Sequence, residues 1–277
     1  MDLRPAIRRW TILPPLEADV LTQMAFDAVI LDQCEQAEDD GYLRFYRMTP
    51  AALTIGYHQK WQRVIDPEAC RKRGWEWARR PTGGGALLHA NEINYAVAMS
   101  TSGWSRQGNV GVQSVFQLIA DAIVSGLTRL GFGADMHVGM GRVAGSERFS
   151  QHGLCGRSVT GHEISLKDAK LVASAQLLRP KGVLQHGTIY LTAPSANDRF
   201  WPADPTEPET GRLKMNWADL GANRSSMCWQ EVAGMLELGF RQRWGIDTES
   251  CTPTTSLRST VRSQEESWQR VDWNRRL

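Results

Sequence analysis

Three consecutive glycines lie between an arginine pair and a histidine in the stretch RRPTGGGALLH, residues 79–89. Each glycine loses more conformational entropy on folding than any other residue, and none contributes a packed side chain. The usual reason to accept that cost is a backbone that turns sharply or lies very close to a ligand. The guanidinium groups of Arg79 and Arg80 suit a ligand with negative charge or a carbonyl group, although both could also be ordinary surface charges.

A second region, residues 154–191, combines a cysteine, two histidines and several lysines with short strand-like runs. Arg157 follows Cys155 by two residues, and a nearby cation favours thiolate, the reactive form of cysteine. Lys170 begins the run KLVASAQ, and His186 precedes a glycine in LQHGTIYL. From local sequence alone, a buried structural cysteine, a solvated lysine and a hydrogen-bonded structural histidine are the more common cases.

The overall charge excludes some classes of function. The chain has 277 residues, 42% of them hydrophobic, and a formal net charge of +2. A dedicated nucleic-acid binder normally shows a strong basic excess, so we expect no nucleic-acid partner, while a weakly basic patch for an acidic protein stays possible. No run of 18 apolar residues and no apolar core of signal-peptide length are present, so we expect neither membrane insertion nor secretion.

The cysteines indicate a reducing environment. There are five, at 34, 70, 155, 228 and 251, and no pair has C-x-x-C spacing. An odd count without such spacing fits neither a disulfide scaffold nor a zinc site, so we expect a cytoplasmic protein without a bound metal. Any one cysteine is then free to act as a nucleophile.

The hydrophobic patterns predict alternating strands and helices without strict βαβ order. Helical spacing of apolar residues runs through 21–36, 114–131 and 228–245, and strand-like runs cover 43–59, broken at Pro50, and 93–100, 162–166, 170–178 and 187–192. Residues 200–211 are rich in proline and acid and read as a linker, and the sequence after about Thr252 is polar and poorly patterned. We predict an α+β fold with a mixed, largely antiparallel sheet flanked by helices.

Taken together, these segments resemble the lipoate–protein ligase and octanoyltransferase family, which shares its fold with biotin–protein ligases. The resemblance runs nearly end to end, and RRPTGGGALLH and SAQ…LQHGTI are its most specific stretches. It implies a single cofactor-transferase domain over residues 1–277, with a core at about 20–195 and a C-terminal helical extension at about 205–277. The family commonly has glycine where Ala173 stands, and the tail after Ile246 matches little.

The residues in these motifs are similar to those of the cysteine-dependent octanoyltransferases. In those enzymes a cysteine precedes a glutamate by eight residues, and a lysine follows the glutamate by seven. Cys155, Glu163 and Lys170 have the same two intervals here. The resemblance implies that Cys155 is the nucleophile and Lys170 the cation beside it. It implies that the acyl pocket is lined by a further set of residues: Arg79, Arg80, Thr82, Gly83, Gly84, Gly85, His89, Ser174, Ala175, Gln176, His186 and Gly187.

The implied reaction moves an octanoyl group from a carrier-protein thioester, through a Cys155 acyl-enzyme, to the acceptor lysine of a lipoyl domain. The donor would be octanoyl-acyl carrier protein or another octanoylated carrier. The acceptor would be the glycine cleavage H protein or a 2-oxoacid dehydrogenase E2, and no cofactor is needed. Because such carriers are usually acidic, we expect them to meet a basic patch: Arg71, Lys72, Arg73, Arg79 and Arg80.

Two other functions stay open at this point. The first is an ATP-dependent lipoate–protein ligase, in which Lys170 contacts an acyl-adenylate, Mg-ATP is required and Cys155 is a bystander. The second is a non-enzymatic relative that binds lipoyl domains or acyl groups without turnover. Loss or survival of activity in Cys155→Ala, with and without Mg-ATP, separates the transferase from the ligase.

Overall fold

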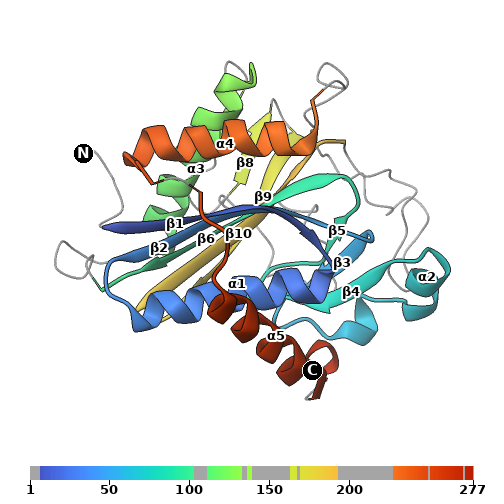
Figure 1. Cartoon of the computed structure of the whole chain (residues 1–277). Helices are drawn as coiled ribbons and strands as arrows, with labels where there is room; N and C mark the ends of the chain where they lie inside the picture. The colour runs from blue at the N-terminus through green and yellow to red at the C-terminus, as the bar shows by residue number, and fades with distance from the viewer. Residues whose placement is uncertain are drawn as a thin grey trace.

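A seven-stranded sheet forms the centre of the computed structural model, which describes residues 7–102, 111–132, 136–138, 163–166, 169–192, 227–248, 250–270 and 272–276 (Figure 1). Its strands are β1 (Arg9–Ala18), β2 (Asp40–Met48), β6 (Glu92–Ser100), β7 (Met136–Val138), β8 (Glu163–Leu166), β9 (Ala169–Leu178) and β10 (Gly182–Tyr190). Their order is β1-β2-β6-β10-β9-β8-β7. β1 and β2 pair in parallel and the other neighbours pair antiparallel, which confirms the mixed, largely antiparallel sheet.

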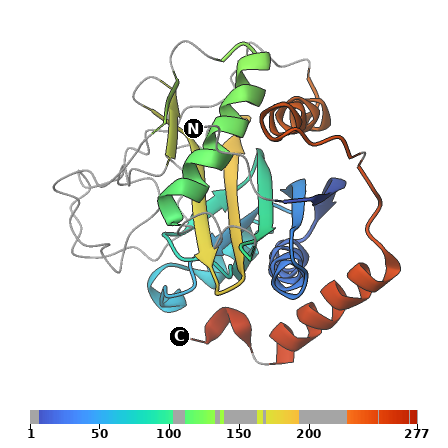
Figure 2. The same ribbon diagram turned by 90° about the vertical axis from the view of Figure 1, so that its left-hand side faces the viewer.

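Helices cover both faces of this sheet. Helices α3 (Val112–Arg129) and α4 (Trp229–Trp244) lie on one face, and α1 (Val20–Gln36) and α5 (Thr255–Arg270) lie on the other (Figures 1 and 2). Each pair buries its own apolar cluster against the strands, as the helical spacing of α1, α3 and α4 predicts. Among the described residues, no helix is long and apolar enough to cross a membrane.

A smaller sheet stands beside the large one and carries the glycine-rich loop. It consists of β3 (Ala52–Ile55), β4 (Glu76–Arg79) and β5 (Leu87–His89), in the order β4-β3-β5, with α2 (Pro67–Lys72) next to it (Figure 1). Residues 80–86 connect β4 to β5, so both ends of the glycine loop are fixed by strands. A Cβ atom on Gly56 would lie 2.0 Å from the Gly84 carbonyl oxygen, so Gly56 allows the loop to pack directly on β3.

Two elements differ from the sequence-based prediction. β1 forms at the sheet edge although it contains Pro14 and Pro15, and its pairing is irregular between Leu13 and Leu16. The segment after Thr252 is not patternless, because it folds into α5 and a 3₁₀ turn, η5 (Trp273–Arg275). The expected linker at 200–211 lies outside the described residues.

Candidate active site

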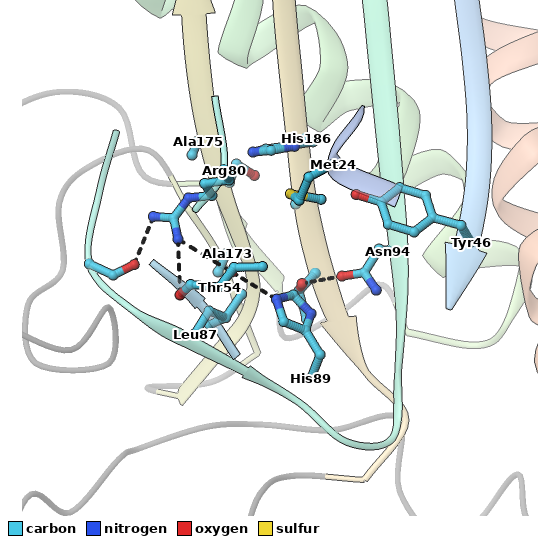
Figure 3. Close-up of a pocket in the computed structure, with 14 residues that line it drawn as sticks. Met24, Tyr46, Thr54, Arg80, Leu87, His89, Asn94, Ala173, Ala175 and His186 are labelled. Atoms are coloured by element: carbon cyan, nitrogen blue, oxygen red, sulfur yellow. Dashed lines mark hydrogen bonds between the residues drawn. The ribbon is translucent and has the colours of Figure 1, made fainter. Parts of the chain in front are cut away.

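A narrow cavity of about 30 Å³ lies between α1, the large sheet and the small sheet (Figure 3). This volume holds about two water molecules. Seven of the sequence-predicted binding residues line it: Arg80, Gly85, His89, Ser174, Ala175, His186 and Gly187. The remaining wall comes from seven residues that the sequence analysis did not select: Met24, Tyr46, Thr54, Leu87, Asn94, Ala173 and Thr188.

The side chain of Arg80 holds the glycine loop in shape. Its guanidinium donates to the carbonyl oxygens of Gly83 (2.7 and 3.1 Å) and Gly85 (2.7 Å), and it reaches Thr54 at 3.4 Å. Gly84, between these two acceptors, has φ +95°, a backbone conformation that favours glycine. Arg80 therefore acts from inside the loop, with only 6% of its surface exposed.

The side chain of Arg79 is fully buried and points away from the cavity-lining set. It donates to the carbonyl oxygens of Gly56, Tyr57 and Gln59 at 2.8–3.0 Å and to those of Trp273 (3.3 Å) and Asn274 (3.0 Å). Burial and the nearby Arg276 lower its pKa to about 10, so it stays charged at neutral pH.

These placements correct one expectation. Neither Arg79 nor Arg80 can present charge to a carrier protein, because both guanidinium groups are buried and bound to backbone carbonyls. The two arginines that begin the motif are internal supports of the loop and of its neighbouring segment.

His186 connects the glycine loop to the buried face of α1. Its Nε2 lies 2.6 Å from Thr82 Oγ1, and its Nδ1 lies 2.7 Å from Asp27 Oδ2. Burial lowers the pKa of His186, which favours a neutral ring. Because the Asp27 carboxylate accepts, the neutral ring carries its proton on Nδ1, and Nε2 accepts from the Thr82 hydroxyl. Thr82 is fully buried, so this arrangement orients the loop and does not expose a second nucleophile.

Asp27 is the centre of a buried polar cluster that sequence reasoning missed. Besides His186, it accepts from Tyr46 (2.9 Å) and pairs with Arg44 (3.1 Å), whose guanidinium also donates to Gln23. Asp27 is 0% exposed and Arg44 1%. A signal was present for Asp27, which stands inside the otherwise apolar run MAFDAVIL.

His89 offers an unsatisfied nitrogen close to the cavity. Its Nε2 is 2.9 Å from Thr54 Oγ1 (Figure 3). Its Nδ1 is buried, finds no hydrogen-bond partner among the described residues, and lies 3.6 Å from Glu92 Oε1. A buried polar atom of this kind normally binds water or a ligand group.

Comparison with known proteins places this architecture. The family described as the lipoyl protein ligase A/B catalytic domain matches residues 19–197, which span α1, the glycine loop and β10. The chain belongs to this family. The described fold agrees with lipoate-protein ligase A bound with ATP (TM-score 0.76, 22% identity, covering 97% of this chain and 99% of that one). It also agrees with the putative lipoate protein ligase Ta0514 of T. acidophilum with bound lipoic acid (TM-score 0.72, 22% identity, covering 98% and 100%).

Several curated relatives bear the name Octanoyltransferase LipM. Octanoyltransferase LipM of Kyrpidia tusciae is 29% identical over 98% of this chain and 100% of its own length. Octanoyltransferase LipM of Moorella thermoacetica is 35% identical over 66% of this chain and 65% of its own length. The similarity to the first of these relatives includes the C-terminal segment that lies beyond the family's catalytic domain.

Strands β9 and β10 contain the SAQ…LQHGTI motif, and part of this motif lines the cavity. Ser174 Oγ lies 2.7 Å from the Tyr95 hydroxyl, which also accepts from Gln185 (2.8 Å), and Gln176 in turn donates to Gln185 (2.5 Å). Gln176 therefore supports the wall from outside the lining set. A Cβ atom on Gly187 would lie 2.3 Å from the Ala173 carbonyl oxygen, so only glycine fits there.

A bulge in β9 decides which way Lys170 faces. Val172 pairs with Ile164 of β8, but the next pair is Lys170 with Ser165, so Leu171 is the extra residue. Opposed residues share a face, and Ile164 belongs to the apolar cluster on the α3 side. Lys170 and Ser165 therefore lie on the other face, the one that bears the cavity, although neither is among the residues that line it. Cys155 lies outside the described residues.

The glycine loop itself yields a paired prediction. A Cβ atom on Gly83 would meet nothing within 4 Å, whereas Gly84 has φ +95° and its Cβ would lie 2.8 Å from Arg80 Nη2. We expect Gly83→Ala to fold with an unchanged Tm, and Gly84→Ala to lose about 1 kcal/mol or more of unfolding free energy. Thermal melts of both variants measure this.

The two variants also distinguish an effect on stability from an effect on the approach of the ligand to the backbone. If bare backbone at Gly83 serves the acyl group, Gly83→Ala will keep its stability and raise KM or lower kcat. Full activity in Gly83→Ala would show that the ligand does not approach this residue.

Proposed function

We propose that this chain is an octanoyltransferase that forms a covalent acyl-enzyme on Cys155 and then acylates a lysine of a lipoyl domain. The observation that carries the proposal is the bulge at Leu171, which brings Lys170 to the face of the sheet that bears the cavity. Bulges next to active sites commonly re-aim a side chain. The relatives named octanoyltransferase, one of them similar over its full length, support the same reaction.

The first half-reaction exchanges one thioester for another. The Cys155 thiolate attacks the carbonyl carbon of the octanoyl thioester, a new carbon–sulfur bond forms, and the donor's thiolate leaves. The number of thioester bonds is unchanged, so this step needs no ATP. In this proposal, the ammonium of Lys170 stabilises the attacking thiolate and the oxyanion that develops on the carbonyl oxygen.

The second half-reaction forms an amide. The amine of the acceptor lysine attacks the acyl-enzyme carbonyl, the Cys155 thiolate leaves, and the amine loses a proton. An amide is more stable than a thioester, so the transfer runs downhill. Division into two steps is ordinary covalent catalysis, and in this proposal the proton goes to His89, which lines the cavity and whose buried Nδ1 has no hydrogen-bond partner among the described residues.

The proposal specifies partners and conditions. The acceptor is a lipoyl domain, and the donor is an octanoylated acyl carrier protein or an octanoylated lipoyl protein. Lipoate-ligase relatives support a lipoyl-domain acceptor, since one solved structure is described as a bipartite lipoate protein ligase and its E2 lipoyl domain. A free thiol nucleophile needs a reducing compartment, so we place the enzyme in the cytoplasm, and the reaction requires neither a metal nor a cofactor.

Intact-protein mass spectrometry tests this function. Wild type, Cys155→Ala and Lys170→Ala are each mixed with octanoyl-acyl carrier protein in the absence of ATP. We expect an octanoyl adduct on the wild type, none on Cys155→Ala, and formation slowed by about 100-fold or more in Lys170→Ala, the typical cost of losing one oxyanion contact.

A different outcome would identify a ligase. If no adduct forms, and a lipoyl domain is modified only when octanoate or lipoate is supplied with Mg-ATP, the acyl-enzyme route is wrong. Modification of the lipoyl domain by Cys155→Ala at the wild-type rate would lead to the same conclusion. Binding of a lipoyl domain without modification under either condition would indicate a non-enzymatic binder.

A further inference from the structure

The C-terminal segment, residues 272–276, is fixed to β4, directly before the glycine loop, by a dense set of hydrogen bonds. Asn274 Oδ1 accepts from the Arg79 amide (2.9 Å), Trp273 Nε1 donates to the Arg79 carbonyl (2.7 Å), and Asn274 Nδ2 donates to Trp77 (3.2 Å). These bonds add to the two that Arg79 donates from its guanidinium. The family's catalytic-domain match ends at residue 197, so this segment is an addition to it.

Once fixed, the segment presents arginines over aromatic rings. Arg275 lies 5.4 Å from the Trp61 ring, and Trp61 stacks on Trp77 at 5.8 Å. Arg276 lies 4.3 Å from the Tyr57 ring and donates to the Tyr57 hydroxyl (2.6 Å). Both arginines are exposed and both tryptophans are half-exposed.

Residues 57–77 and 272–276 together carry a surplus of positive charge. Seven exposed cations lie on residues 57–77 and 272–276: Lys60, Arg63, Arg71, Lys72, Arg73, Arg275 and Arg276. The same two stretches contain four carboxylates, at Asp66, Glu68, Glu76 and Asp272. The surplus of three exceeds the formal charge of +2 for the whole chain, so the rest of the protein is slightly acidic.

This basic, tryptophan-bearing surface adjoins the cavity. The Tyr57 amide donates to the Thr82 carbonyl (2.8 Å), and β4 continues directly into Arg80 and the glycines. Figure 2 shows α2 and the C-terminal turn at the same end of the molecule. Tryptophan, tyrosine and arginine are the residues that dominate binding energy at protein interfaces.

We propose that residues 57–77 and 272–276 form the docking surface for the acidic face of the acceptor domain. A lysine side chain is short, so the domain that carries it must dock directly beside the loop that lines the cavity. The positive surplus selects a domain with surface carboxylates, and the half-exposed tryptophans give it apolar contact area. This inference rests on the proposed function for the identity of the acceptor.

The test measures binding separately from catalysis. Fluorescence anisotropy gives Kd for a labelled, unmodified lipoyl domain with wild type, Arg275→Glu/Arg276→Glu and Lys72→Glu/Arg73→Glu. The matched control, Arg129→Glu/Arg243→Glu, reverses two exposed arginines on α3 and α4, across the sheet. Formation of the acyl-enzyme from a small octanoyl thioester is measured in parallel for all four proteins.

We expect both surface variants to weaken Kd by about tenfold or more at low salt, with a shallower salt dependence, while the control changes it less than about twofold. Acyl-enzyme formation from the small thioester should be unchanged in the surface variants. The Lys72→Glu/Arg73→Glu pair leaves the C-terminal segment intact, so its effect cannot come from loss of that anchor.

Several results would overturn the docking surface. Unchanged Kd in both surface variants, an equal effect in the control, or no detectable binding by the wild type would each do so. Selective loss of binding to octanoyl-acyl carrier protein would reassign the surface to the donor and contradict the proposal. If the wild type forms no acyl-enzyme but binds the domain through these residues, the proposed reaction fails and the surface stands.

Discussion

Asp27→Asn is expected to lower the free energy of unfolding by about 3–5 kcal/mol, because it leaves the Arg44 guanidinium buried without its counter-charge. An asparagine also offers one acceptor oxygen where Tyr46, His186 and Arg44 all approach the carboxylate. For a chain of this length the loss corresponds to a fall in Tm of roughly 10 °C. Urea and thermal unfolding, followed by circular dichroism, measure both quantities.

Asp32→Asn is the matched control on the same helix. Asp32 also pairs with an arginine, Arg179 at 2.5 Å, but its side chain is 39% exposed, so the same substitution should cost less than about 1 kcal/mol. Adding Arg44→Met to Asp27→Asn should recover part of the stability, since no lone charge then remains buried. A cost below about 1 kcal/mol for Asp27→Asn would show that the cluster does not stabilise the fold.

Arg79→Met is expected to cost about 3 kcal/mol or more, because five backbone carbonyls lose a charged donor at once, although the Gly56 carbonyl keeps the Gln59 amide as a second donor. The same change should loosen the C-terminal segment, since it removes the two guanidinium bonds to Trp273 and Asn274 and leaves three bonds to the backbone of Arg79 and Trp77. Thermal melts measure the stability, and limited proteolysis of the last residues measures the loosening.

Two further variants serve as controls for Arg79→Met. Arg79→Lys keeps the charge but lacks the planar fork, so it should restore only part of the stability. Arg73→Met removes an exposed arginine that lies over the Trp75 ring and should cost less than about 1 kcal/mol. Protection of the C-terminal residues in Arg79→Met at the wild-type level would contradict the proposed anchor.

Sequence reasoning succeeded where one strong apolar pattern fixes an element. Helix α3 is buried along the predicted face and ends at Arg129, two residues before Gly131, whose φ is +85°. Helix α4 likewise ends at Gly245, whose φ is +67°. In both cases the local pattern and the tertiary burial agree, so neighbouring residues were sufficient.

The pattern fails where a distant partner decides the structure. β1 forms despite Pro14 and Pro15 because it lies at an edge and pairs in parallel with β2. α5 buries only Leu257, Val261 and Trp268, against α1, and its other residues resemble a solvated tail. Neither partnership leaves a mark in the local sequence.

The candidate site also contains residues that the local sequence predicted and residues whose roles depend on distant contacts. The glycine motif and the SAQ…QHG stretch identified half of the cavity wall, because unusual residue types stand close together there. Asp27 and Arg44 were missed because their roles depend on a contact between α1 and β2. The direction of Lys170 was also beyond reach, since it depends on a pairing irregularity with β8.

Two of the hydrogen-bond partners of Arg79, Trp273 and Asn274, are synthesised long after Arg79 itself. Asn274 lies 195 residues after Arg79, so at ~5–20 residues per second the ribosome needs about 10–40 s to supply it. Throughout that interval Arg79, at the end of β4, lacks two of the five carbonyl acceptors that it has in the folded protein. The nascent chain therefore passes through a stage in which most of the large sheet has been made while the substrate-side loop still lacks its final support.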